Sequence, residues 1–522
     1  MELEQLYPLM LKIIIILIVF LVFLNYKYIT GSLKKVKKKI WLLMFLVFII
    51  GLLVRLFLIP HTHYVYYDSF EHVNMAQNIH YSNKYCTCNY GAPQECYDCM
   101  KQPWPGGYHT LQSLVFDLFH ASEKVVFNTT AVIASISIIL FFILIYLITQ
   151  DSVLALFGAS IFSLNPVHLK LSGSPSLMIY SIFFILLSMI FLEIFIAKKK
   201  FSLFFLFLTT LLYTTQTRSE NLLLFFIFTA YILARYPEFI GELLKPKYLL
   251  ILLLTGLMLF FFVHFMENAH KNLEQSEECG ELFSTKLFCY FSMNNLMDNI
   301  LPNILYFMHL KFNALFLFLL SIPGGFKLYK ENKKQLAYYL LFFIAFFILF
   351  ASYHIGNFTY VDSFRYMLPL FIPLILMSTY GIKFFLKKAK FNKGLLILLF
   401  IMIYSSGLIF SFDFIKSEIR NDNFYDCIKS VEEKLPRNAH IIAYNPRVIM
   451  STIEHNSMQL EFISAKNLRE VHNTLIFFEA ALNPSTKQKL KTTKNNLMEY
   501  YDFKLIEKNT NCAFYNMTRK NS

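Results

Sequence analysis

Two carboxylates open the first long polar segment of this chain. Asp68 and Glu71 lie in the stretch YYDSFEHVNMAQNI, residues 66–79, which directly follows a long apolar run. If this stretch is helical, both side chains share a face with His72, because residues three and four apart are neighbours on a helix. Carboxylates at the edge of an apolar segment are suited to proton transfer from a reacting hydroxyl. The simpler alternative is that Asp68 only caps a short surface helix.

Cationic groups gather at three other boundaries between polar loops and apolar runs. His168 and Lys170 lie in SLNPVHLKLSGSPSLMIY, Arg218 lies in TQTRSENLLL, and Arg365 lies in NFTYVDSFRYMLPLFIPL. Ionisable groups beside apolar helices are costly to bury and often mark functional sites. Each could instead be a side chain that snorkels towards water or pairs with a neighbour. Together they could bind a lipid phosphate, because arginine grips phosphate through two hydrogen bonds.

The elements that must position these groups are membrane helices. The chain of 522 residues is 56% hydrophobic, has a mean hydropathy of +0.48 and contains 16% charged residues, whereas soluble proteins have about 25%. Inside a bilayer the backbone must satisfy its own hydrogen bonds, so the spans should be helices. The net charge of +14 does not indicate a nucleic-acid partner, because the basic residues lie mostly in short loops, where they set orientation. We therefore expect an all-α, multi-pass membrane protein.

The apolar runs predict about twelve spans of the length that a bilayer requires. Lysine-rich loops should face the cytoplasm, which places both termini, the long loop 60–125 and the C-terminal segment outside. If the two runs beside the tight turn TQTRSE formed one bent span, every later segment would change sides. The lysine-rich loops are residues 26–39, 198–200, 327–334 and 383–393. The expected spans are 9–25, 40–59, 126–148, 153–169, 176–197, 201–216, 221–235, 248–266, 305–325, 336–354, 367–386 and 394–412.

Residues 413–522 form a segment distinct from the membrane domain, 1–412, because polarity rises sharply after the last span. HIIAYNP and TLIFFEAAL contain short apolar runs that suit buried strands, and CAFYNM suits a final strand. Segments near 421–435 and 484–500 suit helices. We expect a small extracytoplasmic α/β domain.

The eight cysteines all lie in segments that the charge rule places outside. Cysteines confined to one side of a membrane indicate disulfides formed in an oxidising compartment. We predict a Cys279–Cys289 bond within one outer loop and a Cys427–Cys512 bond that joins the two ends of the C-terminal domain.

The other four cysteines form the cluster CTCNYGAPQECYDC. Cys86, Cys88, Cys96 and Cys99 could bind zinc as four thiolates or form two crossed disulfides. Pairing of Cys86 with Cys88 has poor geometry, so bonds across the gap are favoured. The compartment favours disulfides over zinc.

A second surface helix is expected at YHTLQSLVFDLFH, residues 108–120. It is too short to cross a bilayer, and an amphipathic helix of this kind lies in the membrane interface. We expect His109 and Asp117 to belong to its solvated polar face. The apolar face comprises Leu111, Leu114, Val115, Leu118 and Phe119.

The order of these motifs resembles the GT-C superfamily of integral-membrane glycosyltransferases, especially its dolichyl-phosphate-mannose protein mannosyltransferase and ArnT-like branch. The family's acidic motif is matched by residues 68–71, and PWPGGYHTLQSL is similar to its proline-rich lead into the second surface helix. Residues 218–220, Arg-Ser-Glu, resemble its Arg-Pro-Glu element, and residues 365–369 resemble its Arg-Tyr-Leu-Leu-Pro element. The likeness runs over roughly residues 40–412. The departures are the spread of the acidic pair to positions 68 and 71, the absence of the Trp-Trp-Asp motif of oligosaccharyltransferases, and the additional span 9–25.

The resemblance implies transfer of a sugar from a polyprenyl-phosphate donor, of the dolichyl-phosphate type, to a protein or glycan acceptor on the outer face, with inversion of the anomeric carbon. In a eukaryote the membrane would be that of the endoplasmic reticulum, and otherwise the cell membrane. Asp68 would be the general base, and Glu71 would orient the acceptor or help bind Mg²⁺ or Mn²⁺. Arg218 or Arg365 would hold the departing phosphate, assisted by Lys170 and His168.

Two alternatives belong to other classes. One is a transporter or flippase for a lipid-linked saccharide, although transporters usually place charges near the middle of the membrane and show internal repeats. The other is a non-catalytic partner in the assembly of such saccharides.

Overall fold

The computed structural model describes most of the chain. The residues outside the described part are 1–2, 64–67, 93, 101, 103, 272–290, 361, 389–392, 418–427, 429–433, 437–438, 444–455, 460–474, 481–483, 510–511 and 521–522. Cys279, Cys289 and Cys427 lie among these residues. Cys512 is disulfide-bonded. Because the other three cysteines lie outside the described part, the predicted Cys427–Cys512 and Cys279–Cys289 pairs stay predictions.

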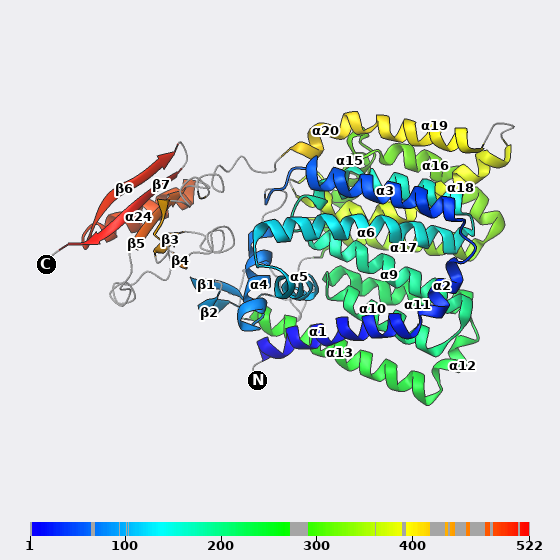
Figure 1. The fold of residues 1–522 in the computed structure, drawn as a ribbon, viewed down its shortest axis with the longest axis horizontal. Coiled ribbons are helices and arrows are strands. Elements are labelled where there is room, and N and C mark those ends of the chain that lie inside the picture. Colours follow the sequence, from blue (N-terminus) through cyan, green and yellow to red (C-terminus); the bar gives the residue numbers. More distant parts are fainter. Residues whose placement is uncertain are drawn as a thin grey trace.

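The membrane domain is a bundle of helices that run side by side (Figure 1). Seven described helices are long and apolar enough to cross a bilayer, and two bent pairs raise that number to as many as nine. The seven are α1 (Leu3–Leu24), α3 (Lys38–Phe57), α6 (Glu123–Thr149), α9 (Leu177–Lys198), α13 (Pro246–Lys271), α17 (Lys333–Ser352) and α18 (Leu368–Lys388) with its leading turn η3 (Ser363–Met367).

The remaining predicted spans are bent or shorter than expected. The pair α7 (Ser152–Ser163) and α8 (Pro166–Ser172) bends by 58°, and α19 (Lys393–Ser406) with α20 (Leu408–Lys416) bends by 43°. Eleven of the twelve expected runs correspond to a helix or a bent pair, whereas the expected run 305–325 covers the end of one helix, a 3-10 turn and the start of the next helix. The others are α10 (Phe201–Thr215), α11 (Leu223–Arg235) and α16 (Ala314–Glu331), with α2 (Tyr26–Leu33), α12 (Phe239–Leu243), α15 (Met293–Phe307) and η2 (Leu310–Phe312) between spans.

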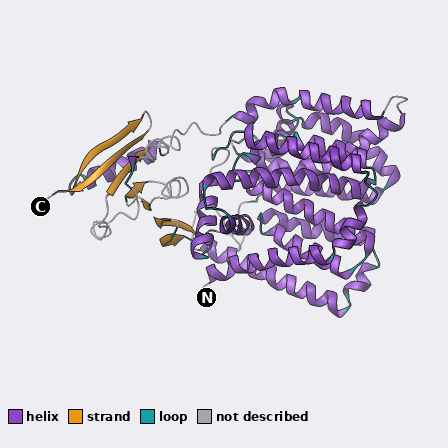
Figure 2. Ribbon diagram, in the orientation of Figure 1, coloured by secondary structure: helices purple, strands orange, loops and turns teal. Residues whose placement is uncertain are grey.

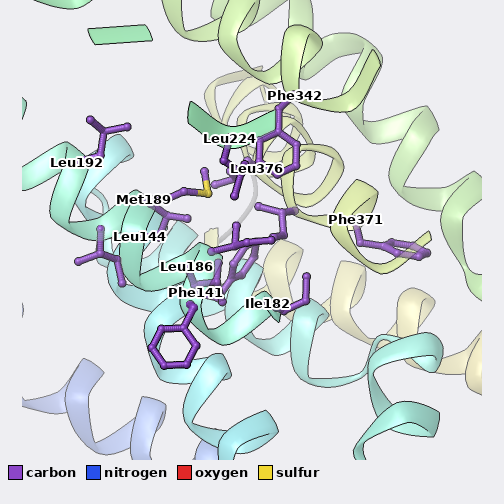
Figure 3. Close-up of a cluster of buried hydrophobic side chains, with 14 of the residues drawn as sticks. Phe141, Leu144, Ile182, Leu186, Met189, Leu192, Leu224, Phe342, Phe371 and Leu376 are labelled. Atoms are coloured by element: carbon purple, nitrogen blue, oxygen red, sulfur yellow. The ribbon is translucent and has the colours of Figure 1, made fainter. Parts of the chain in front are cut away.

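The core of the bundle is built around α9, which is among its most buried helices. Leucine and phenylalanine side chains from α6, α9, α11, α17 and α18 interdigitate there (Figure 3). In lipid, helix association depends on such close packing because the surrounding chains are as apolar as leucine. The labelled residues include Phe141, Ile182, Leu186, Leu224, Phe342 and Phe371.

The tight turn after α10 reverses the chain. Lys199, just before α10, forms an ion pair of 3.4 Å with Glu238, just after α11. Lys334 Nζ also donates to the carbonyl oxygen of Ala234, at 2.6 Å. The start of α10 and the end of α11 thus lie at one end of the bundle, here called the lysine end. The two runs are separate antiparallel helices, so the predicted alternation of sides is retained.

The opposite end of the bundle, here called the site end, carries both termini, the first loop and all the strands (Figures 1 and 2). The loop consists of α4 (Ser69–Ser82), the hairpin β1 (Thr87–Ala92) and β2 (Glu95–Met100), and α5 (Gly107–Leu118). Disulfides join Cys86 to Cys99 and Cys88 to Cys96. The bonds cross the gap as expected, but they are nested rather than crossed, because β1 and β2 pair as an antiparallel hairpin.

The orientation of α5 corrects one prediction. His109 is fully buried together with Tyr108, Thr110, Gln112 and Ser113, whereas Leu118 and Phe119 are exposed. The polar face of α5 therefore packs against the protein, and part of its apolar face points outward. Only Asp117 keeps the predicted exposure, and it pairs with His80 at 2.6 Å. The helix presents polar groups inward because it packs against α4, α1, α6 and α10.

The C-terminal domain is built on β3 (His440–Ala443), β4 (Asn456–Gln459), β5 (Leu475–Ala480), β6 (Tyr501–Asn509) and β7 (Cys512–Arg519), with α24 (Pro484–Leu497). The sheet order is β2-β1-β4-β3-β5-β7-β6, in which β3 is parallel to β4 and β5. The first-loop hairpin joins this sheet, because Tyr90 pairs with Met458 and Gly91 with Ser457. The domain is thus connected to the loop that carries Asp68.

Candidate active site

Asp68 occupies the N-cap position of α4, but its side chain makes no capping hydrogen bond. Its backbone oxygen accepts a bond of 3.1 Å from the backbone nitrogen of His72, which starts the helix. The side chain is half-buried, and its negative charge acts on the guanidinium of Arg365. A capping role alone does not account for this placement, because the carboxylate also interacts with Arg365, which lies outside its own helix.

Arg365 lies in η3, the turn that leads into α18. Its side chain is only 10% exposed and its Nη1 lies 3.5 Å from Oδ2 of Asp362. The guanidinium also lies over the ring of Tyr366, 5.3 Å from the ring centroid. A charge buried to this degree requires partners, and these two residues help to supply them.

Arg218 lies between α10 and η1 (Ser219–Leu222) and also reaches Tyr366, whose ring centroid is 5.4 Å from its guanidinium carbon. Glu220 accepts bonds from Nε and Nη2 of Arg218, with a distance of 3.1 Å from Nε to Oε2. Burial raises the pKa of Glu220, but the charge of Arg218, the hydrogen bonds and the charge of Arg365 together lower it more, so the pKa lies below its usual value. The pair is therefore ionised at neutral pH.

The site thus gathers acidic groups and two arginines whose charges are already balanced. Tyr366 brings the two guanidiniums together, and each has its own carboxylate partner, Glu220 or Asp362. A phosphate would have to share these donors or displace a carboxylate. Such a phosphate would lie on arginines whose orientation is set in advance, which favours charge stabilisation during a reaction.

His72 and His109 form a buried pair that the sequence reasoning did not assign. His72 Nδ1 lies 3.0 Å from His109 Nε2, which joins α4 to α5. Burial lowers the pKa of His109 to about 3. Burial, then the charges of His109, Arg365 and Arg218, hold the pKa of His72 well below its usual value. Both rings are neutral at pH 7, and their lowered pKa values make them weak proton acceptors. The i, i+4 spacing of Asp68 and His72 was visible in the sequence, but the pairing with His109 was not.

The structure places His168 and Lys170 in other networks. His168 Nδ1 lies 2.9 Å from Nη2 of Arg55, beside the bend between α7 and α8. Lys170 Nζ donates to the carbonyl oxygens of Phe414 and Ser417 at the end of α20 and to Ser417 Oγ at 2.9 Å. Lys170 thereby binds the last membrane helix where it leaves the bundle. Their predicted contact with a donor phosphate stays a prediction.

Glu71 lies in the first turn of α4, half-buried. Within the described residues no three metal-binding side chains converge, and the charge that faces Asp68 is the cation of Arg365. Mg²⁺ and Mn²⁺ bind several oxygen ligands, and the predicted role of Glu71 in binding either ion stays a prediction.

The bundle, the two loop helices and the terminal sheet together form a polytopic membrane protein with an ArnT-like fold. One solved structure with this fold is ArnT from Cupriavidus metallidurans, bound to undecaprenyl phosphate. Its TM-score to this chain is 0.59 at 11% sequence identity, covering 92% of this chain and 98% of ArnT. No protein-family model and no curated protein sequence matches the chain.

Proposed function

We propose that this protein is a membrane glycosyltransferase that takes a sugar from a polyprenyl-phosphate donor and transfers it to a hydroxyl of a protein or glycan acceptor. The observation that carries the proposal is that the charge of Asp68 acts on Arg365, which shares the ring of Tyr366 with Arg218. The shared fold with ArnT, which was crystallised with undecaprenyl phosphate, supports a prenyl-phosphate donor.

In the proposed reaction the oxygen of the acceptor hydroxyl attacks the anomeric carbon of the sugar, and Asp68 accepts the proton of that hydroxyl. The bond between that carbon and the phosphate oxygen breaks, and the prenyl phosphate leaves with one additional negative charge. Arg365 and Arg218 stabilise that charge, because their positions are set before the reaction begins. A single displacement inverts the configuration at the anomeric carbon. Glu71 would orient the acceptor from the same helix turn.

The proposal requires the site end to face the outside of the membrane. The lysine end carries Lys199, Lys330 and Lys334, and basic loops remain in the cytoplasm. The disulfides of the first loop support the same orientation, because such bonds persist in oxidising compartments.

The test is transfer of a labelled sugar by purified protein in lipid vesicles. A radiolabelled polyprenyl-phosphate sugar is supplied with acceptor fractions, one of protein and one of glycolipid, from cells that lack the gene. Label in either fraction that depends on Asp68 supports a transferase. If the protein only moves the donor between leaflets, or if Asp68→Asn transfers label normally, the proposal fails.

A further inference from the structure

His63 lies between the first residue of α4 and the first residue of α6, five residues before Asp68 in the sequence. Its side chain is buried, with 3% of the residue exposed. Nε2 lies 2.7 Å from Oε1 of Glu123, the first residue of α6. Nδ1 lies 3.2 Å from Oγ of Ser69, the first residue of α4. The imidazole thus connects the start of a membrane span to the start of the helix that Asp68 precedes.

Hydrogen bonds hold the imidazole from both sides. Ser69 Oγ donates its proton to the backbone oxygen of His63, at 2.9 Å, and lies 3.2 Å from Nδ1 of the ring. Glu123 lies at the N-terminus of a helix, where the helix dipole favours the ionised carboxylate, and an ionised carboxylate only accepts. Nε2 therefore donates to Glu123, and the ring joins the first residues of α4 and α6.

Two hydrogen bonds connect His63 to Ser69, the residue that directly follows Asp68. The ring of Phe70 stacks on His63 at 4.1 Å and also packs against the apolar cluster of the C-terminal domain. Asp68 is thus followed by two residues whose positions His63 sets. A displacement of about 1 Å at a reacting group can cost about 100-fold in rate. The contacts that hold Ser69 and Phe70 should therefore affect the rate of the proposed reaction.

We propose that His63, held by hydrogen bonds between Glu123 and Ser69, is the positioning residue for Asp68. The inference rests on the proposed transferase function. His63 acts through Ser69 and takes no part in proton transfer, whereas the arginines that would bind the donor lie on other elements. Loss of His63 should therefore lower kcat and leave the KM for the donor unchanged.

The first experiment compares His63→Gln and Ser69→Ala with wild type in the vesicle assay. We expect kcat to fall by about 10- to 100-fold in both variants with an unchanged donor KM. The matched control is His80→Asn, because His80 pairs with Asp117 at the other end of α4; its kcat should equal that of wild type. Equal kcat in wild type and both variants, or a loss confined to KM, would overturn the inference.

The second experiment uses Glu123→Gln, which retains the shape of the side chain and removes its charge. The amide of Gln accepts a weaker hydrogen bond from Nε2 of His63 than the carboxylate does, so His63 should hold Ser69 less firmly. We expect kcat to fall with an unchanged donor KM. A kcat equal to that of wild type would contradict the proposal even if the His63 variants failed to fold.

Asp68→Asn distinguishes a failure of the proposed role of Asp68 as base from a failure of the proposed positioning role of His63. If Asp68→Asn retains transfer, the proposed role of the base fails, and the positioning inference fails with it. If Asp68→Asn is inactive while His63→Gln and Ser69→Ala match wild type, only the positioning inference is overturned.

Discussion

Arg218 and Arg365 lie over the ring of the same residue, Tyr366, at 5.4 and 5.3 Å from its centroid. One arginine precedes α11 and the other leads into α18, so two distant parts of the chain bring like charges to one place. This arrangement is stable because Glu220 and Asp362 each balance one guanidinium. The proposed role of both arginines in binding the donor phosphate rests on this shared position.

Substitution of the candidate base is the most direct test of the chemistry. Asp68→Asn keeps the size of the side chain but cannot accept a proton, so turnover should fall by about 10²- to 10⁴-fold. Transfer of labelled sugar in vesicles measures it. Asp117→Asn, on the same loop and exposed, should keep wild-type turnover; a similar loss there would indicate damage to the loop and not to the base.

The two arginines should be sensitive to replacement by lysine. Arg218→Lys and Arg365→Lys retain the positive charge but lose the planar, two-pronged donor, so we expect kcat to fall by about 10²- to 10³-fold. Steady-state kinetics with the labelled donor measure the change. Arg235→Lys is the control, because Arg235 lies over Tyr231 at the lysine end. Unchanged kcat in both site variants would exclude them from phosphate stabilisation.

The buried histidine pair should make the folded state sensitive to acid. Burial lowers the pKa of His109 to about 3, whereas an unfolded histidine titrates near 6.5. Between these values the unfolded chain binds more protons, so the free energy of unfolding decreases as pH falls. The melting temperature should drop from about pH 7 to about pH 4, and less steeply in His109→Gln. The exposed control His120→Gln should follow wild type; parallel curves for His109→Gln and wild type would refute the assignment.

The nested disulfides should stabilise the first loop. The bond between Cys86 and Cys99 closes a loop of 13 residues, for which the expected contribution is about 3 kcal/mol. The double variant Cys86→Ser/Cys99→Ser should therefore melt at a lower temperature. Non-reducing peptide mapping should recover Cys86–Cys99 and Cys88–Cys96. Stoichiometric zinc with free thiols at these positions would show that the cluster is a metal site instead.

The orientation is testable in intact cells. Lys124 is exposed at the site end, and Lys330 is exposed at the lysine end. A membrane-impermeant maleimide should label Lys124→Cys in intact cells and Lys330→Cys only after permeabilisation. The reverse pattern would place Asp68 in the cytoplasm and remove the basis of the proposed function.

The sequence predicted the helical membrane domain, the acidic loop and the C-terminal strands, because length, hydropathy and alternation are local properties. Beyond the residue patterns, the order of short motifs pointed to the GT-C fold, which the structure shares with ArnT. The prediction for His109 was wrong because an amphipathic pattern does not tell which face meets protein when a helix lies between membrane and loop. The pairing of His63 with Glu123 had no signal in the sequence, since neither residue belongs to a motif.

What the sequence determined by itself is which segments are apolar enough to cross a membrane and which ionisable groups lie at their ends. Only the tertiary structure decided which of those groups meet. Arg365 faces Asp68 and Arg218 shares its tyrosine, while Lys170 holds the end of α20 instead. The physical reason is that each residue contributes separately to the free energy of transferring a span into lipid. Contacts between loops depend instead on how the helices pack around α9.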